Sequence, residues 1–230
     1  MSTAEDGEDC STTLKRSTNA NPLFLTTSRN LLLILTRNPE LGKCKTRLAA
    51  TIGDKAALEI YQILLDHTVQ VTKDLPCDKH VYYSERIIPE DIWDNERYTK
   101  KLQQGADLGQ RIQGAFQNGF NEGYTKIVVI GSDMYNLTNQ DIMRAFASLD
   151  DNDVVLGPAK DGGYYLLGMK QLLPAVFHSK DWGTDTVFED TIKDLQGMKV
   201  GLLDERNDVD RYEDILGIPV FEPFLIDLRP

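Results

Sequence analysis

Apolar runs alternate with stretches of helical periodicity through most of this chain. Residues 30–36 are almost continuously apolar and are soon followed by Asn38-Pro39, which is typical of a strand that is buried on both faces and then stops. Leu and Ile alone would also suit a buried helix. Residues 126–130 form the clearest second run, and between 54 and 74 apolar residues recur at intervals of three and four. The pattern therefore indicates buried strands with covering helices.

The remaining segments extend this alternation. They predict strands over residues 80–84, 153–157, 164–167 and 198–203, and helices over residues 45–50, 107–120, 138–149 and 186–195. Asp54 and Thr138 are the expected N-caps of their helices, and Thr184 or Asp185 is expected to cap the last one. Strands that alternate with helices predict a three-layer α/β/α fold around a mostly parallel sheet.

One domain is expected over residues 30–216. Residues 1–29 are rich in Ser, Thr, Asn and acidic residues, which is typical of a disordered tail, and residues 217–230 form a short apolar tail that the pattern does not place. The chain shows neither a signal-peptide pattern nor an apolar stretch as long as a membrane span. Its three cysteines have no disulfide or metal spacing, so we expect a cytoplasmic protein.

The charge balance limits the class of ligand. The chain has 25 Lys and Arg against 36 Asp and Glu, a formal net charge of -11. Long-range repulsion disfavours the binding of nucleic acid, so no nucleic-acid partner is expected. A small anionic ligand would need a local basic loop and a divalent cation. Lys43, Lys45 and Arg47 lie within five positions of one another and supply such a loop.

Several short polar segments lie where predicted strands end. Ligands of open α/β sheets bind beyond the carboxyl ends of strands, so these segments predict one nucleotide-type pocket built in pieces. In the 36–48 loop, Gly42 and the helix start would offer backbone N–H groups to a phosphate, while Lys45 and Arg47 add charge. The loop lacks the spacing of a Walker A motif, and a solvated helix start is the competing interpretation.

Acidic residues follow two of the later strands. Asp133 comes directly after Gly131-Ser132 and is well placed to hold Mg²⁺ or Mn²⁺, although a turn-capping role would also fit. Asp208 and Asp210 could add a second metal contact, with a solvated acidic turn as the alternative.

Two glycine-containing segments are the candidate substrate side of the pocket. In Asp161-Gly162-Gly163-Tyr164-Tyr165, the glycines would let a substrate lie against the backbone and Tyr164 would contact it, although Asp-Gly-Gly also suits a hairpin turn. Trp182-Gly183-Thr184 precedes a predicted helix and would present open backbone donors, or serve only as a cap.

Together the ordered segments resemble a known family, the small bacterial GT-A-like transferases often labelled glycosyltransferases and sometimes associated with arsenosugar biosynthesis. That family is distantly similar to the phospholactate and molybdenum-cofactor guanylyltransferases. The resemblance covers about residues 30–215. Its carriers are Pro39-x-x-Gly42-x-x-Lys45-Thr46-Arg47-Leu48, Gln104-Gly105-x-Asp107-Leu108-Gly109-x-Arg111, Gly131-Ser132-Asp133, Leu156-Gly157-Pro158-Ala159-Lys160-Asp161-Gly162-Gly163-Tyr164-Tyr165-Leu166, Trp182-x-Thr184 and Asp208-Val209-Asp210.

The resemblance implies a GT-A-like nucleotide-diphospho-sugar transferase fold and a role for each segment. The implied nucleotide-binding residues are Thr36, Gly42, Lys45, Arg47 and Asp107. The implied metal, Mg²⁺ or Mn²⁺, would be held by Asp133 and shared with Asp210. The acceptor would lie near Gly163, Tyr164, Trp182 and Thr184, and Asp161 is the candidate general base.

Three functions follow as hypotheses. The first is a metal-dependent glycosyltransferase-like enzyme that uses a nucleotide-activated sugar donor and a small-molecule acceptor. The second is a nucleotidylyltransferase that acts on an NTP and a phosphorylated small molecule. The third is a nucleotide-binding protein with impaired catalysis, because Met134-Tyr135-Asn136 replaces the family's usual Cys-Pro after the aspartate and Gly183 replaces a serine.

Overall fold

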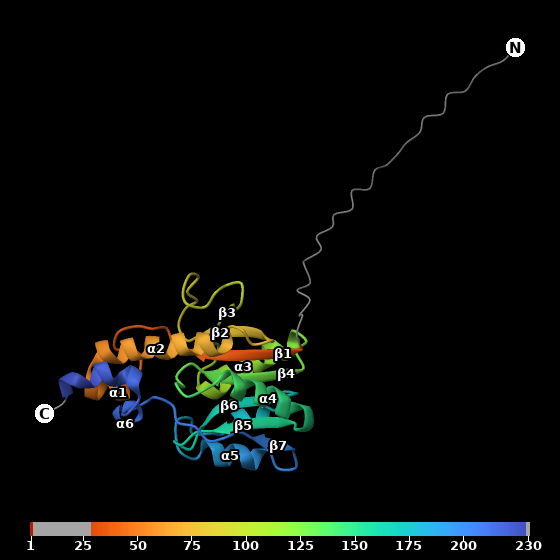
Figure 1. Cartoon of the computed structure of the whole chain (residues 1–230). Helices are drawn as coiled ribbons and strands as arrows, with labels where there is room; N and C mark the ends of the chain where they lie inside the picture. The colour runs from red at the N-terminus through yellow and green to blue at the C-terminus, as the bar shows by residue number, and fades with distance from the viewer. Residues whose placement is uncertain (2–28, 229–230) are drawn as a thin grey trace.

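The computed structural model describes residue 1 and residues 29–228, and it forms a seven-stranded sheet between two layers of helices (Figure 1). The strands are β1 (Asn30–Thr36), β2 (Asp78–Tyr83), β3 (Thr99–Leu102), β4 (Lys126–Gly131), β5 (Val154–Pro158), β6 (Tyr164–Met169) and β7 (Val200–Leu202). The helices are α1 (Thr46–Ile52), α2 (Asp54–Thr72), α3 (Leu108–Asn121), α4 (Asn139–Asp151), α5 (Val187–Asp194) and α6 (Tyr212–Ile215), with 3₁₀ helices η1 (Pro174–Phe177) and η2 (Pro219–Leu228).

The strand order is β3-β2-β1-β4-β6-β5-β7, and β6 is antiparallel to both of its neighbours. All other pairings are parallel. The carboxyl ends of β1, β2, β4 and β5 therefore meet at one edge of the sheet, where β6 begins. The predicted three-layer fold with a mostly parallel sheet is confirmed.

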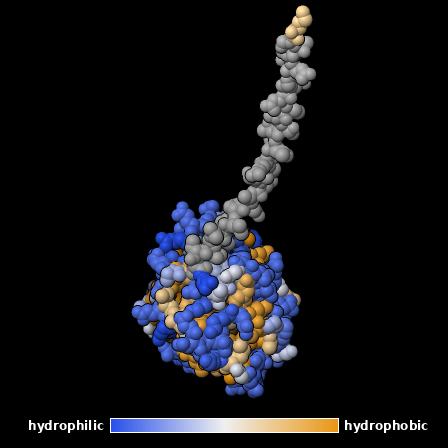
Figure 2. All heavy atoms as spheres, turned by 90° about the vertical axis from the view of Figure 1, so that its right-hand side faces the viewer, coloured by the Kyte–Doolittle hydropathy of each residue, from blue (hydrophilic) through white to orange (hydrophobic). Residues whose placement is uncertain are grey.

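Both faces of the sheet are apolar, because alternate residues of the buried strands point to opposite sides. Leu32 and Ile34 of β1 pack with the helices α1, α2 and α4, whereas Leu31 and Leu33 pack with α3, η1 and the segment after α5. This double burial explains why β1 and β4 are continuous apolar runs. On the face that Figure 2 shows, hydrophilic residues predominate and hydrophobic ones lie among them.

The element boundaries mostly follow the sequence pattern, with two corrections at helix starts. Thr138 is the N-cap of α4 and forms a capping box with Asp141, as predicted for this residue. Asp54 is wrong as a cap, because Gly53 occupies the N-cap position with a φ of 86° that suits glycine. Thr184 and Asp185 are also wrong, because α5 begins after Thr186.

Four elements were not predicted, namely β3, η1, α6 and η2. Strand β3 has the sequence Thr-Lys-Lys-Leu, which carries no apolar alternation because β3 lies at the edge of the sheet. The tail after residue 216 forms η2, which packs on α1 with Phe221 fully buried. The predicted disordered tail lies mainly outside the described residues. No helix in the described part of the chain has the length and apolarity that a membrane crossing needs.

Candidate functional site

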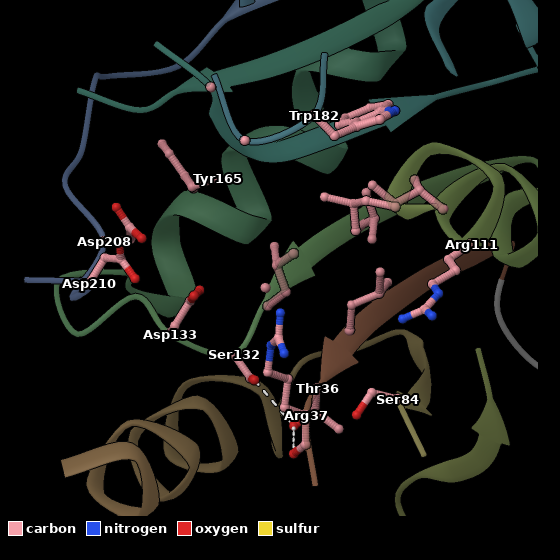
Figure 3. Close-up of a pocket in the computed structure, with 18 of the residues that line it drawn as sticks. Thr36, Arg37, Ser84, Arg111, Ser132, Asp133, Tyr165, Trp182, Asp208 and Asp210 are labelled. Atoms are coloured by element: carbon pink, nitrogen blue, oxygen red, sulfur yellow. Dashed lines mark hydrogen bonds between the residues drawn. The ribbon is translucent and has the colours of Figure 1, made fainter. Parts of the chain in front are cut away.

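The ends of β1, β2 and β4 and the start of β6 form the floor of a cleft with a volume of about 660 Å³ (Figure 3). Its charge is divided. Arg37, after β1, and Arg111, on α3, line one part, whereas Asp133, Asp208 and Asp210 line another. Such a division suits a ligand whose anionic part lies between the guanidinium groups and whose counter-charge is held at the carboxylates.

The two arginines carry most of the uncompensated positive charge. Both direct their guanidinium groups into the cleft (Figure 3). The Nε of Arg111 donates to the carbonyl of Gly105 at 3.1 Å, which leaves its two terminal nitrogens for a ligand. Among the described residues, neither arginine forms an ion pair, whereas Lys43 in the same cleft is paired with Glu40 at 2.7 Å. Free guanidinium groups suit bidentate contacts with phosphate oxygens.

Lys45 lies at the junction between the loop after β1 and helix α1. It is the N-cap of α1 and has left-handed backbone angles, with a φ of 48°. Its side chain is only 8 % exposed, and its Nζ donates to Asp133 Oδ2 at 2.8 Å. Burial opposes the charge on Lys45, but attraction to Asp133, Asp208 and Asp210 outweighs burial and raises its pKa.

The acidic part of the cleft joins two loops that are distant in the sequence. The backbone N–H of Val209 donates to the carbonyl of Asp133 at 3.2 Å, which places Asp208 and Asp210 beside Asp133. Burial would raise the pKa of Asp133, but the Lys45 ammonium holds it below its usual range. Burial, Asp133 and the other nearby carboxylates raise the pKa of Asp208 to about 6.

The donor chemistry of this acidic part fits Mg²⁺ or Mn²⁺, which prefer carboxylate oxygens. In the described part of the chain, no three His, Cys, Asp or Glu side chains are grouped closely enough to hold an ion by themselves. Mg²⁺ is commonly bound by one or two carboxylates together with substrate phosphates. Burial, and after it the neighbouring carboxylates, disfavour the charged form of Asp208, and a bound cation would favour that form.

Aromatic side chains form another part of the cleft wall. Trp182 and Tyr164 pack edge to face, with ring centroids 6.3 Å apart. Gly109 at the start of α3 allows this packing, because a Cβ there would lie 2.5 Å from the Trp182 indole nitrogen. Asp161 accepts a hydrogen bond from the backbone N–H of Gly163 at 2.9 Å and so shapes the turn before β6.

The structure brings together most of the residues singled out in the sequence. Those that line the cleft are Thr36, Lys45, Asp107, Asp133, Asp161, Gly163, Tyr164, Trp182, Thr184 and Asp210. Gly42 and Arg47 do not line it. Gly42 shapes the loop with a φ of 72°, and Arg47 instead pairs with Asp210 at 2.9 Å. Asp107 lines the cleft as the N-cap of α3 and accepts from the backbone of Gln110.

Sequence reasoning missed five polar residues that line the cleft, namely Arg37, Tyr61, Ser84, Glu85 and Gln103. Arg37 and Ser84 directly follow strands β1 and β2, so their place after a strand was an available signal. Tyr61 lies in the middle of α2, where it matched the apolar face, and Gln103 follows the unpredicted β3. Neither carried a local signal.

The fold is similar to solved structures of nucleotide-using enzymes. The chain is 29% identical to a protein from Desulfovibrio desulfuricans G20, provisionally assigned as a nucleotide-diphospho-sugar transferase, with a TM-score of 0.75 over 87% of this chain and 95% of that one. This match confirms the GT-A-like nucleotide-diphospho-sugar transferase fold.

Two more distant structures show the fold alone. A homologue of Mycobacterium tuberculosis rv0371c from Mycobacterium sp. strain JC1 is 14% identical, with a TM-score of 0.52 over 87% of this chain and 98% of that one. The 4-diphosphocytidyl-2C-methyl-D-erythritol synthase of Anaerococcus prevotii DSM 20548 is 8% identical, with a TM-score of 0.53 over 86% and 96%. No protein of curated function matches the sequence.

A family model matches residues 65–184, which is more than half of the chain and includes the strand ends that carry Asp133 and Tyr164. Its description is that of an uncharacterized protein conserved in bacteria. The chain therefore belongs to the DUF2064 family.

Proposed function

We propose that this protein is a transferase that uses a nucleotide-activated donor, with a nucleotide sugar as the leading candidate. The observation that carries the proposal is the pair of arginines, Arg37 and Arg111, which face the cleft and form no salt bridge among the described residues. In a chain with a net charge of -11, two unpaired guanidinium groups in one cleft favour an anionic ligand such as a diphosphate. The similarity to the Desulfovibrio protein supports this class of donor.

Each part of the cleft has a proposed role. Arg37, Arg111 and Lys45 would bind the phosphates, and Asp133 with Asp210 would hold Mg²⁺ or Mn²⁺. When bound, the ion would supply positive charge against the negative charge that develops on the leaving diphosphate. Lys45, already at Asp133, would keep that carboxylate oriented.

The acceptor would occupy the wall formed by Gly163, Tyr164, Trp182 and Thr184. Asp161 lies beside this wall and uses one carboxylate oxygen to hold the turn, so we propose that the other accepts the proton of an acceptor hydroxyl. The association with arsenosugar biosynthesis stays a prediction about the acceptor.

A nucleotidylyltransferase is the second candidate. Two free arginines and Lys45 suit a triphosphate at least as well as a diphosphate, and the synthase of Anaerococcus prevotii shares the fold. The two reactions differ in their products, because nucleotidyl transfer from an NTP releases pyrophosphate and sugar transfer releases a nucleoside phosphate.

The first experiment measures thermal stability with UDP-, GDP-, CDP-, ADP- and dTDP-sugars and with NTPs, each with Mg²⁺, Mn²⁺ or EDTA. A ligand at 100 times its Kd should stabilise the fold by about 2.7 kcal/mol. A metal-dependent shift with one nucleotide sugar supports the leading proposal, and a shift with an NTP alone supports the second. Binding without turnover over a broad acceptor panel would favour the catalytically impaired protein, and no shift at all would contradict every nucleotide-dependent function.

Replacing Arg111 tests the phosphate contact directly. We expect Arg111→Gln to weaken binding of the stabilising nucleotide about tenfold, because a charge-assisted hydrogen bond is lost. Arg97→Gln is the matched control, since Arg97 is paired with Asp74 at 2.7 Å and does not line the cleft. Equal affinities of both variants by calorimetry would remove Arg111 from the site.

Replacing Asp133 tests the metal site. We expect Asp133→Asn to abolish the difference in nucleotide affinity between Mg²⁺ and EDTA, because the carboxylate that would hold the ion loses its charge. The exposed Asp151 at the end of α4 provides the control Asp151→Asn. A metal dependence that survives in Asp133→Asn would disprove the assignment.

A further inference from the structure

A single phenol hydroxyl ties together the ends of the two strands that carry Arg37 and Asp133. Tyr61 of α2 accepts a hydrogen bond from the backbone N–H of Arg37 at 2.9 Å, and its Oη lies 3.2 Å from the carbonyl of the same residue. The same Oη lies 3.2 Å from the Thr36 and Ser132 hydroxyls. These two hydroxyls are also 3.2 Å apart, which closes a polar network at the floor of the cleft.

The network stands where the regular hydrogen bonding of β1 ends. Among the described residues, the strand pairing of β1 does not extend beyond Thr36, so the backbone of Arg37 is bonded by side chains: its N–H by Tyr61, and its C=O by the hydroxyls of Tyr61 and Thr36. Thr36 and Ser132 are both buried, so their hydroxyls have no ready access to water. Removing the phenol oxygen would leave the Arg37 N–H without its side-chain partner, and it would take one of two hydroxyl contacts from Thr36 and from Ser132, which still contact each other.

We propose that Tyr61 is a positioning residue that orients the phosphate-binding end of the cleft through Arg37 and Ser132. The proposal rests on the proposed function, since it assumes that Arg37 binds phosphate. Tyr61 holds the Arg37 backbone on both its N–H and its C=O and so sets the direction in which the guanidinium leaves the strand. It also braces Ser132, directly before Asp133, so one hydroxyl sets the spacing between the basic and the acidic part.

The hydroxyl stays protonated, as this role requires. Burial raises the pKa of Tyr61 and outweighs its hydrogen bonds to Ser132, Thr36 and Arg37. A neutral phenol both donates and accepts, whereas a phenolate could not donate to a carbonyl.

The test compares Tyr61→Phe with Tyr98→Phe. Both tyrosines are 3 % exposed, and each substitution removes a buried hydroxyl contact. For Tyr98 this is the contact with the Thr72 hydroxyl at 2.9 Å. Tyr98 does not line the cleft, so it controls for any effect of lower stability. Calorimetric titrations use UDP, GDP, CDP, ADP and dTDP with Mg²⁺, at a temperature where both variants are folded. We expect Tyr61→Phe to lower the affinity for the tightest-binding of these nucleotides about tenfold. Tyr98→Phe should bind that nucleotide with the same affinity as the unaltered protein.

A double-mutant cycle with Arg37→Gln separates positioning from general damage. If Tyr61 acts through Arg37, the nucleotide affinity of the double variant should lie within about twofold of that of Arg37→Gln. If the two residues act independently, their losses of affinity would multiply. The inference would be overturned if Tyr61→Phe bound the nucleotide as tightly as the unaltered protein, or if the losses of affinity multiplied in the double variant. Either result would leave the proposed function standing. If the unaltered protein binds none of the five nucleotides, both fall.

A second variant keeps the test decisive if Tyr61→Phe does not fold. Ser132→Ala removes the hydroxyl partner directly after β4 and leaves the bonds of Tyr61 to the Arg37 backbone. We expect a loss of about threefold in affinity for the same nucleotide. An unchanged affinity would overturn the role of the network.

Discussion

At the scale of single residues, Lys45 shows where the fold accepts strain next to the cleft. A left-handed backbone costs a residue with a side chain about 1 kcal/mol or more. Lys45 adopts it with a φ of 48°, and this conformation turns its ammonium toward Asp133. The strained backbone and the pair with Asp133 coincide at the residue that we propose binds phosphate.

His80 in β2 gives a prediction for acid stability. It is 3 % exposed, and its Nε2 lies 3.8 Å from Glu122, which is itself paired with Lys101. Burial, with a smaller contribution from Lys101, lowers the pKa of His80 to about 3. As the pH falls from about 6.5 to 3, His80 therefore binds a proton in the unfolded chain, where a histidine pKa is about 6.5, but not in the folded chain.

We expect the free energy of unfolding to fall by about 2 kcal/mol between pH 7.5 and pH 5 because of His80. His80→Phe should remove this part of the pH dependence, since a neutral ring against Tyr124 takes up no proton. Urea unfolding at both pH values measures it, with the exposed His178→Phe as control. The same loss in His80→Phe as in the unaltered protein would show that other groups control the acid response.

At the scale of elements, the start of α4 fixes the relative position of the two acidic loops. Asp141 accepts from the backbone N–H of Thr138 at 2.9 Å and pairs with Arg206 at 2.7 Å. Arg206 also donates to the carbonyl of Asn136 at 2.9 Å. The loop after β4 and the loop that carries Asp208 are thus clamped by one buried carboxylate.

We expect Asp141→Asn to lower the free energy of unfolding by about 3 kcal/mol. The carboxylate is 2 % exposed, so the change breaks a capping box and leaves the mostly buried Arg206 without its charge partner. Asp151→Asn, at the exposed end of the same helix, should change it by less than about 0.5 kcal/mol. Denaturant unfolding measures both, and similar values for the two would mean that the clamp contributes little.

At the scale of the whole molecule, the C-terminal segment supports the helix that follows Lys45. Helices α6 and η2 both contact α1, and Phe221 packs against Tyr135 with ring centroids 5.1 Å apart. Ile215, Phe221 and Leu225 of this segment belong to the core cluster that includes β1 and β4. The last part of the described chain therefore stabilises the first loop of the cleft.

We expect Phe221→Ala to lower the free energy of unfolding by about 3 to 4 kcal/mol, since the ring is fully buried. Val220→Ala is the matched control, because Val220 is exposed and adjacent. Thermal unfolding monitored by circular dichroism measures both. A loss below about 1 kcal/mol in Phe221→Ala would mean that the segment is not integral to the core.

Much of this fold was readable from local sequence. The double burial of β1 and β4 requires continuous apolar runs, and the one-sided burial of α2 requires apolar residues at intervals of three and four. The polar segments after these strands also predicted the edge at which the cleft lies, because parallel strands bring their carboxyl ends together. These features depend on neighbours in the sequence, so the sequence alone determined them.

Only the tertiary structure decided which polar groups meet. Lys45 and Asp133 are 88 positions apart, and Tyr61 and Ser132 are 71 apart, so no local period relates them. The same holds for the edge strand β3, which carries no apolar alternation and is defined by its pairing with β2. Local periodicity records only how deeply each residue is buried, whereas a site is made by contacts between distant segments that strand order and loop geometry bring together.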